Sequence, residues 1–119
     1  MVARQRLLKD MDLEKRRSLR KALVSSGRLR SEAAAPLSIT TINLAADGIA
    51  ISASGKVFAG TQYTIDFEIV ISGKPCPVTA VTEAMFCVYA GDGVFKAGLK
   101  FMELDPHTAS LISQFLTGH

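Results

Sequence analysis

The chain has 119 residues, 48% of them hydrophobic, and a formal net charge of +3. A chain of this length can form one domain around its own core, and no apolar run approaches the ~18 residues that a membrane span requires. The charged amino-terminal segment lacks the apolar stretch of a secretory signal. The two cysteines, Cys76 and Cys87, are too few for a disulfide framework or a zinc site. Both observations favour a cytoplasmic protein with reduced thiols.

Positive charge is concentrated at the amino-terminal end. Residues 1–30 contain ten of the fourteen Lys and Arg residues but three of the eleven acidic residues, so a basic arm precedes a mildly acidic body. Such an arm predicts an anionic partner, although a solvated tail has the same composition. Residues 1–14 show weak helical periodicity and are expected to form a flexible leader, and residues 15–20 form a polar connector.

Residues 21–104 have the pattern of short β-strands separated by turn residues. The cleanest alternation of apolar and polar residues predicts that Ile65, Phe67, Ile69, Leu99 and Phe101 face the core. Six strands are expected, at Ala22–Arg30, Leu37–Asn43, Ile49–Ala53, Tyr63–Ile71, Pro77–Tyr89 (with a bulge near Glu83-Ala84) and Phe95–Phe101.

A single helix is expected over residues 105–117. Asp105 can cap it, Pro106 suits its first turn, and Gly118 can end it. The apolar side chains of this helix fall on one face, at Leu111, Ile112, Phe115 and Leu116. The prediction is therefore a mainly β protein, a six-stranded antiparallel split β-barrel with a carboxy-terminal α-helix that covers one open end or edge.

Catalysis is disfavoured by the residues that the chain offers. The two histidines, His107 and His119, lie near no nucleophile, metal partner or carboxylate pair in the sequence. The carboxylates are scattered on polar strand faces, and the glycines match no phosphate-binding or dinucleotide-binding loop. We therefore expect no enzyme activity, no catalytic residue, no metal site and no cofactor.

Two short segments offer binding chemistry instead. The first is the basic segment Arg16-Arg17-Ser18-Leu19-Arg20, which places Arg16 and Arg20 four residues apart. A guanidinium can bind a phosphate through two hydrogen bonds, pair with the O6/N7 edge of guanine, or stack on the base. The second is Asn43-Leu44-Ala45-Ala46-Asp47-Gly48, in which Asn43 can donate to and accept from a guanine edge and Gly48 is expected to supply a positive φ.

These segments together resemble the PilZ domain family, whose pattern is R-x-x-x-R followed about two dozen residues later by [D/N]-x-S-x-x-G. Arg16, Arg20, Asn43 and Gly48 match the pattern, whereas Ala45 stands where the family has serine. The resemblance extends over roughly residues 14–117 through the strand order and the final Asp-Pro helix. It divides the chain into the leader, residues 1–14, and a PilZ-like domain, residues 15–119, with arm 15–20, barrel 21–104 and helix 105–117.

The resemblance implies a bacterial receptor for the second messenger cyclic di-GMP, a class associated with motility and biofilm control. Carried over to this chain, it implies a ligand site formed by Arg16, Arg17 and Arg20 of the arm with Asn43, Ala45 and Gly48 of the barrel. Ligand binding would reorder the arm and so signal to a downstream protein. The missing serine hydroxyl removes one neutral hydrogen bond, worth ~0.5–1.5 kcal/mol, and so weakens binding without abolishing it.

Two other functions remain open. One is a PilZ-fold adaptor that binds no nucleotide and acts by protein contact, as in type IV pilus biogenesis, and Ala45 favours it. The other is a small RNA-binding barrel that uses the basic arm. It is disfavoured because 7% of the residues are aromatic, none is tryptophan, and most of the aromatic residues fall on predicted core faces, whereas base stacking needs exposed rings.

Overall fold

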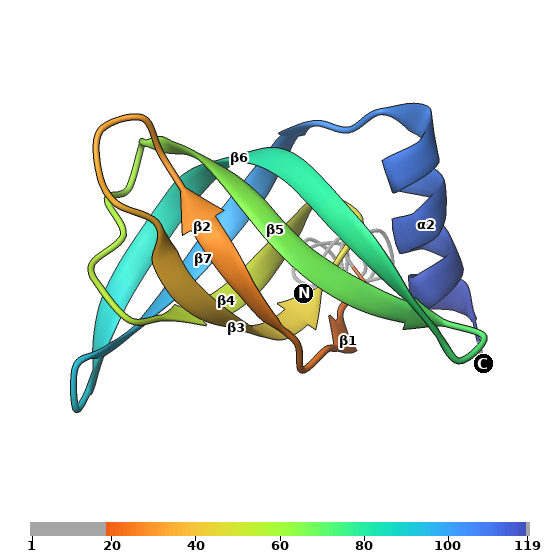
Figure 1. Cartoon of the computed structure of the whole chain (residues 1–119), viewed down its shortest axis with the longest axis horizontal. Coiled ribbons are helices and arrows are strands. Elements are labelled where there is room, and N and C mark those ends of the chain that lie inside the picture. Colours follow the sequence, from red (N-terminus) through yellow and green to blue (C-terminus); the bar gives the residue numbers. More distant parts are fainter. Residues whose placement is uncertain (1–18, 119) are drawn as a thin grey trace, which may run out of the picture.

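The computed structural model describes residues 19–118 and shows a closed β-barrel with one helix across an end (Figure 1). Seven strands form one antiparallel sheet in the order β1-β3-β2-β5-β6-β7-β4, and a further pairing of β3 with β4 closes it. The elements are β1 (Lys21–Ala22), β2 (Ser26–Arg30), β3 (Leu37–Leu44), β4 (Gly48–Ala53), β5 (Gln62–Ile71), β6 (Lys74–Gly91), β7 (Val94–Glu103) and α2 (Pro106–Thr117).

The predicted fold class is confirmed, with one difference in the first strand. Ala22–Arg30 was expected to be continuous, but the chain leaves the sheet at residues 23–25 and so forms β1 and β2, both paired with β3. The buried hydroxyl of Thr41 explains why this break is tolerated. It donates to the carbonyl of Leu23 at 2.7 Å and accepts from the backbone N–H of Ser25 at 2.8 Å, which satisfies both groups. The remaining six strands form the ring.

Hairpin chemistry fixes the register of the second half of the sheet. Asp92 and Gly93 both have positive φ, as a tight turn between β6 and β7 requires. The predicted bulge in β6 is confirmed, because its register against β7 shifts between Ala84 and Phe86. The extra residue reverses which side chains face inward, so that Ala84 is buried on one side of the bulge and Phe86 is exposed on the other.

The core contains every strand residue expected there. Ile65, Phe67, Ile69, Leu99 and Phe101 are all buried. The helix places Ile112 in the same core and packs its other apolar side chains half-buried against it, namely Leu111, Phe115 and Leu116. Helix α2 starts as predicted, with the Asp105 carboxylate accepting from the Thr108 backbone N–H at 2.7 Å.

Five of the eight aromatic residues are buried or half-buried, in line with the expectation that most of them fall on core faces. Three of them are buried, at Tyr63, Phe67 and Phe101, and Phe95 and Phe115 are half-buried. The other three are exposed, namely Phe58, Phe86 and Tyr89. Both cysteines are free and half-buried, as expected for reduced thiols. In the described part of the chain, no helix is long and apolar enough to cross a membrane.

Candidate functional site

The end of β3 and the start of β1 bring the two predicted segments together. Lys21 lies opposite Leu44 and Ala22 opposite Asn43, so the residue before β1 must lie beside the end of β3. Arg20 accordingly donates a hydrogen bond from Nη1 to Oδ1 of Asn43 at 2.8 Å, across 23 positions of sequence. The structure thus places one arginine of the basic segment in direct contact with the first residue of the barrel segment.

The charge of Arg20 remains available for an anion. Its side chain is exposed and is hydrogen-bonded to the neutral amide of Asn43. Among residues 19–118, the single ion pair joins Arg30 and Asp66, so no carboxylate within the described residues neutralises Arg20. A cation on a neutral acceptor can turn to a phosphate without losing an ion pair, which lowers the cost of ligand binding.

The segment after Asn43 forms a tight turn held on two sides. The backbone N–H of Ala45 donates to the carbonyl of Gly48 at 2.9 Å, which closes the turn between β3 and β4. The backbone N–H of Phe101 donates to the carbonyl of Asp47, also at 2.9 Å, which ties the turn to β7. Ala45 itself is fully buried, so the position that carries serine in the family pattern lies beneath the turn surface.

Gly48 is required for a reason other than the expected one. The prediction of a positive φ at this position is wrong, because the glycines with positive φ lie elsewhere in the chain. Instead, Gly48 begins β4 opposite Lys100, and a Cβ atom there would lie 2.4 Å from the carbonyl oxygen of Leu99. Any side chain would push β4 away from β7 and move the turn, so glycine is needed for close backbone approach.

Two of the predicted site residues, Arg16 and Arg17, lie outside the described residues. Their placement relative to Arg20 and Asn43 therefore remains a prediction from the spacing of the basic segment.

The sequence did not single out Lys21, which joins this site to the helix. Its Nζ atom donates to the carbonyl of Phe115 at 2.8 Å and to that of Gly118 at 3.4 Å, and lies 4.5 Å from the centre of the Phe115 ring. Helix α2 has no basic residue in its last turn, so Lys21 supplies the positive charge that unpaired carboxy-terminal carbonyls favour. The lack of a basic residue in the last turn of the helix was the sequence signal that a cation from elsewhere in the chain, here Lys21, would lie at this end.

Leu19, on the other side of Arg20 from Lys21, also joins the candidate site to helix α2. It lines an apolar groove of about 260 Å³ between the turn and the helix, together with Ala46, Leu104, Ile112 and Leu116. Three successive residues thus contact three places: Leu19 the groove at α2, Arg20 the end of β3, and Lys21 the end of α2.

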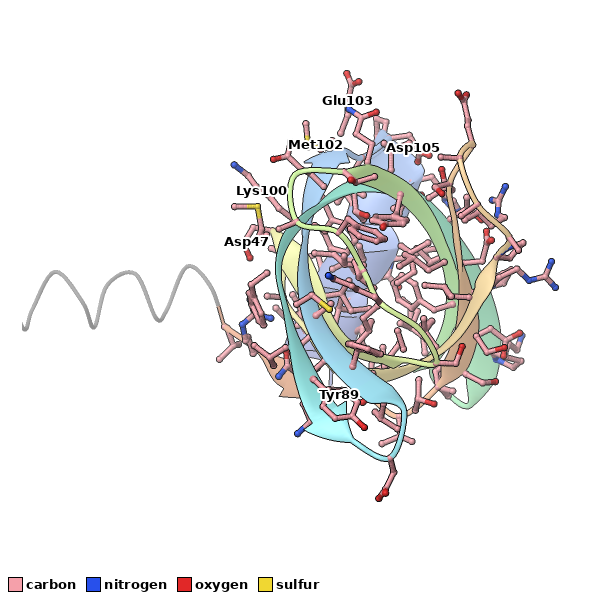
Figure 2. The ribbon with its side chains drawn as sticks, turned by 90° about the vertical axis from the view of Figure 1, so that its left-hand side faces the viewer. Asp47, Tyr89, Lys100, Met102, Glu103 and Asp105 are labelled. Atoms are coloured by element: carbon pink, nitrogen blue, oxygen red, sulfur yellow. The ribbon has the colours of Figure 1, made fainter. Side chains whose placement is uncertain are left out.

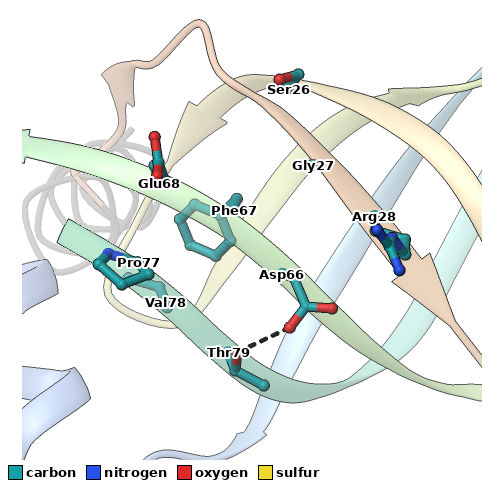
Figure 3. Close-up of a pocket in the computed structure, with 9 residues that line it drawn as sticks. All are labelled: Ser26, Gly27, Arg28, Asp66, Phe67, Glu68, Pro77, Val78 and Thr79. Atoms are coloured by element: carbon teal, nitrogen blue, oxygen red, sulfur yellow. Dashed lines mark hydrogen bonds between the residues drawn. The ribbon is translucent and has the colours of Figure 1, made fainter. Parts of the chain in front are cut away.

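A second groove, of about 660 Å³, lies on the outer wall formed by β2, β5 and β6 (Figure 3). Asp66 dominates its chemistry. Its carboxylate accepts from Arg30 at 2.7 and 3.1 Å and from the Thr79 hydroxyl at 2.7 Å. The hydrogen bond from Arg30 holds the pKa of the Asp66 carboxyl below its usual value. With Glu68 and the exposed Arg28 also in its lining, this groove carries charges of both signs, and it includes no residue of the predicted site.

Comparisons with known proteins bear on the fold and the family of this chain. The family model for the PilZ domain matches residues 14–118. Three similar solved structures are the motility inhibitor MotI/DgrA of Bacillus subtilis (16% identity, TM-score 0.70), the PilZ domain of YcgR from Escherichia coli with c-di-GMP (12%, 0.65), and the PilZ domain of CeSA from a cellulose-synthesizing bacterium (13%, 0.57).

The matches cover most of this chain but unequal parts of the other proteins. They cover 83%, 86% and 85% of this chain, and 48%, 88% and 97% of the motility inhibitor, the YcgR domain and the CeSA domain. The chain therefore spans about half the length of the motility inhibitor. A comparison with curated proteins finds no match. At these identities the structural likeness establishes the fold, and the family model, which covers nearly the whole chain, establishes that this protein belongs to the PilZ domain family.

Proposed function

We propose that this chain is a bacterial receptor for cyclic di-GMP, bound between the basic arm and the turn after β3. The observation that carries the proposal is the hydrogen bond between Arg20 and Asn43. It joins the two halves of the family motif on the barrel surface, with the guanidinium free of any described carboxylate. The YcgR domain that was solved with c-di-GMP has a similar fold and supports the same ligand here.

The chemistry of the ligand fits these groups. Cyclic di-GMP presents two phosphates and two guanine bases, and an arginine can bind either by a charge-assisted pair of hydrogen bonds. Arg20 would contact the ligand beside Asn43, which can offer its amide to a guanine edge. Arg16 and Arg17 would complete the arm around it. The close approach of β4 to β7 at Gly48 fixes the turn that would carry the ligand.

The signal would pass through the residues next to Arg20. When Arg20 turns from Asn43 to the ligand, the backbone of the arm moves, and Leu19 and Lys21 are its immediate neighbours. Lys21 holds the carboxy-terminal end of α2 through the Phe115 carbonyl. Ligand binding would therefore change the hold on α2, and α2 would present the change to a downstream protein.

A calorimetric titration of the full chain with cyclic di-GMP tests the receptor. Arg20→Ala removes charge-assisted hydrogen bonds worth ~1.5–3 kcal/mol, so binding should weaken at least ~10-fold. Arg28→Ala is the matched control, because it removes one exposed arginine from β2, outside the proposed site, and gives the same net charge. Its affinity should stay within ~2-fold of the unchanged protein.

Two further results sharpen this test. Arg20→Lys should restore binding only in part, because lysine keeps the charge and loses the planar fork. Binding should also weaken as salt rises, because exposed phosphate contacts are screened. Equal losses in Arg20→Ala and Arg28→Ala would mean that net charge alone attracts the nucleotide, and would refute the site.

The alternative is a PilZ-fold adaptor that binds no nucleotide and acts through protein contact. The observation that favours it is Ala45, which lacks the serine hydroxyl of the family pattern. A protein that shows no heat of binding at low salt, and that stays silent as Ala45→Ser, would support the adaptor. The resemblance to a motility inhibitor is a likeness of fold and is compatible with either function.

A further inference from the structure

One stretch of β6 has a strand on one side only. β6 pairs with β5 from Lys74 to Glu83, and the loop before β5 then takes over Ala84, whose carbonyl accepts from Gly60 and whose N–H donates to Thr61. From Met85 to Gly91, β6 pairs with β7 alone, and no other strand of the described residues lies along its second edge. We call residues Met85–Gly91 the open edge.

The open edge is apolar and projects from the barrel. In Figure 1 the β6–β7 hairpin extends at the lower left, away from α2, and Figure 2 shows Tyr89 near its tip. Met85, Phe86, Val88 and Tyr89 are each more than half exposed. Phe86 packs over Gly98, where a Cβ atom would lie 2.3 Å from its ring, so the exposed ring is held in place rather than free to turn inward.

The rest of the same strand shows how an exposed edge is normally protected. The first part of β6 carries Lys74, Pro75 and Pro77, and charge and proline both discourage pairing with another chain. From Ala84 to Gly91 the strand has no charged residue and no proline. The open edge thus combines unpaired backbone groups with an uncharged apolar surface, which are the two requirements for adding a further strand.

We propose that the open edge pairs with the open edge of a second copy of this chain, so that two barrels share one continuous antiparallel sheet. The strand of the open edge carries no charge, and the charged side chain opposite Val88 on β7 is Lys96, so the edge does not attract the basic amino-terminal segment, whereas a second copy presents the same uncharged apolar strand. The pairing is a two-fold interface, in which one surface serves both partners.

Geometry restricts the register of such a pair. Opposed residues must project their side chains from the same face of the sheet, so a two-fold pair places one residue opposite its own copy. With Cys87 at this position, Phe86 of each copy lies opposite Val88 of the other, and an aromatic ring meets a β-branched side chain. Cys87 then lies about 4.5–5.5 Å, Cα to Cα, from its own copy, within range of a disulfide.

The oligomeric state of the full chain, measured without nucleotide, tests the proposal independently of ligand binding. Sedimentation should show a mass rising from the 12.8 kDa monomer toward twice that value between about 1 and about 500 µM. Val88→Lys places a charge on the open edge and should weaken self-association at least ~10-fold.

Val70→Lys is the matched control, because Val70 and Val88 are 56% and 54% exposed and Val70 pairs with Pro75, away from the open edge. Its self-association should remain within ~2-fold. In a Cys76→Ser background, mild oxidation should yield a disulfide dimer through Cys87, and adding Val88→Lys should abolish it. A monomer at every concentration, or a dimer that Val88→Lys leaves unchanged, would overturn the proposal.

Discussion

The two ends of the barrel are completed in different ways. At one end, α2 lies across the opening, buries Ile112 in the core and receives Lys21 at its carboxy-terminal end (Figure 1). At the other end, the β4–β5 loop buries Val57 in the core, but the β6–β7 hairpin runs past it with Val88 and Tyr89 exposed. One end is covered by the chain itself, and the other retains apolar surface.

This difference separates two tasks that a small barrel has to perform. The α2 end contains both the candidate ligand site and the groove lined by Leu19, so a change at Arg20 reaches buried structure within one residue on either side. The hairpin end includes no residue of the candidate site, and its exposed side chains are available for contact with another molecule. We infer that binding and response belong to the α2 end, and assembly belongs to the hairpin end.

The two ends of the barrel should differ most in the effect of a core substitution on the free energy of unfolding. Phe101, on β7 toward the α2 end, is 7% exposed, and Phe58, in the loop at the opposite end, is 56% exposed. Phe101→Ala should lower the free energy of unfolding by ~3–5 kcal/mol, because it leaves a cavity in a filled core. Denaturant titration measures the loss.

Phe58→Ala provides the control with the same chemical change. Phe58 is more than half exposed and its ring lies 5.2 Å from Lys56 Nζ, so the free energy of unfolding should fall by less than ~1 kcal/mol. Similar losses in the two variants would show that the hairpin end is packed as firmly as the α2 end, and the comparison would fail.

The next effect concerns the connection between arm and helix. Lys21→Met keeps most of the side-chain length but removes the donor to the Phe115 carbonyl, which should lower the free energy of unfolding by ~0.5–1.5 kcal/mol. Amide hydrogen exchange should then show the last turn of α2 opening more often. In the unchanged protein, cyclic di-GMP should alter exchange in this turn, whereas in Lys21→Met it should bind with similar affinity and leave the turn unaffected.

Cyclic di-GMP could bind both proteins and yet leave amide exchange in the last turn of α2 unaltered. That result would contradict the proposal that α2 carries the signal, but not the proposal that the protein binds the nucleotide. The receptor would stand, and α2 would no longer be its output element.

Much of the fold could be predicted because its signals are local in the sequence: either neighbouring residues interact, or apolar and polar residues alternate along a strand. Ile65, Phe67 and Ile69 occupy every second position of a strand with one buried face, and Asp105 caps the helix that directly follows it. The break between β1 and β2 could not be predicted in the same way. It depends on the hydroxyl of Thr41, which lies 18 residues beyond Leu23 and is brought there by the sheet.

The candidate site was predicted by resemblance, and only some of its physical reasons were correct. Arg20 and Asn43 do meet, but Gly48 is needed because of Leu99, a residue on another strand about which the local pattern carries no information. The position of the Phe86 ring outside the barrel, over Gly98 of β7, could not be predicted from the local pattern either. Both features depend on neighbours distant in sequence.

A smaller effect is expected at Ala45, where the α2 end departs from the family pattern. Ala45→Ser adds a hydroxyl beneath the turn, and a phosphate at the turn surface could accept from it. Affinity for cyclic di-GMP should rise, by at most about tenfold, because one neutral hydrogen bond is gained. Calorimetry measures this gain, and Ala46→Ser, an exposed neighbour on the same turn, is the control that should leave affinity unchanged. Equal gains in both variants would exclude a specific hydroxyl contact.

The smallest effect is expected on the side wall, where Asp66 belongs to neither end and so provides a reference for both. The hydrogen bond from Arg30 lowers the pKa of Asp66 in the folded protein, so this carboxylate stabilises the fold above its unfolded pKa of about 3.9. The contribution is lost as the pH falls through the lower folded value, and stability should therefore decline on acidification. Because the Arg30 and Asp66 side chains are 44% and 35% exposed, solvent screening leaves the effect small. Asp66→Asn should flatten the acid side of the stability profile below about pH 4 while leaving nucleotide affinity and self-association unchanged. An acid decline in Asp66→Asn as steep as in the unchanged protein, or steeper, would mean that the ion pair between Arg30 and Asp66 does not stabilise the wall.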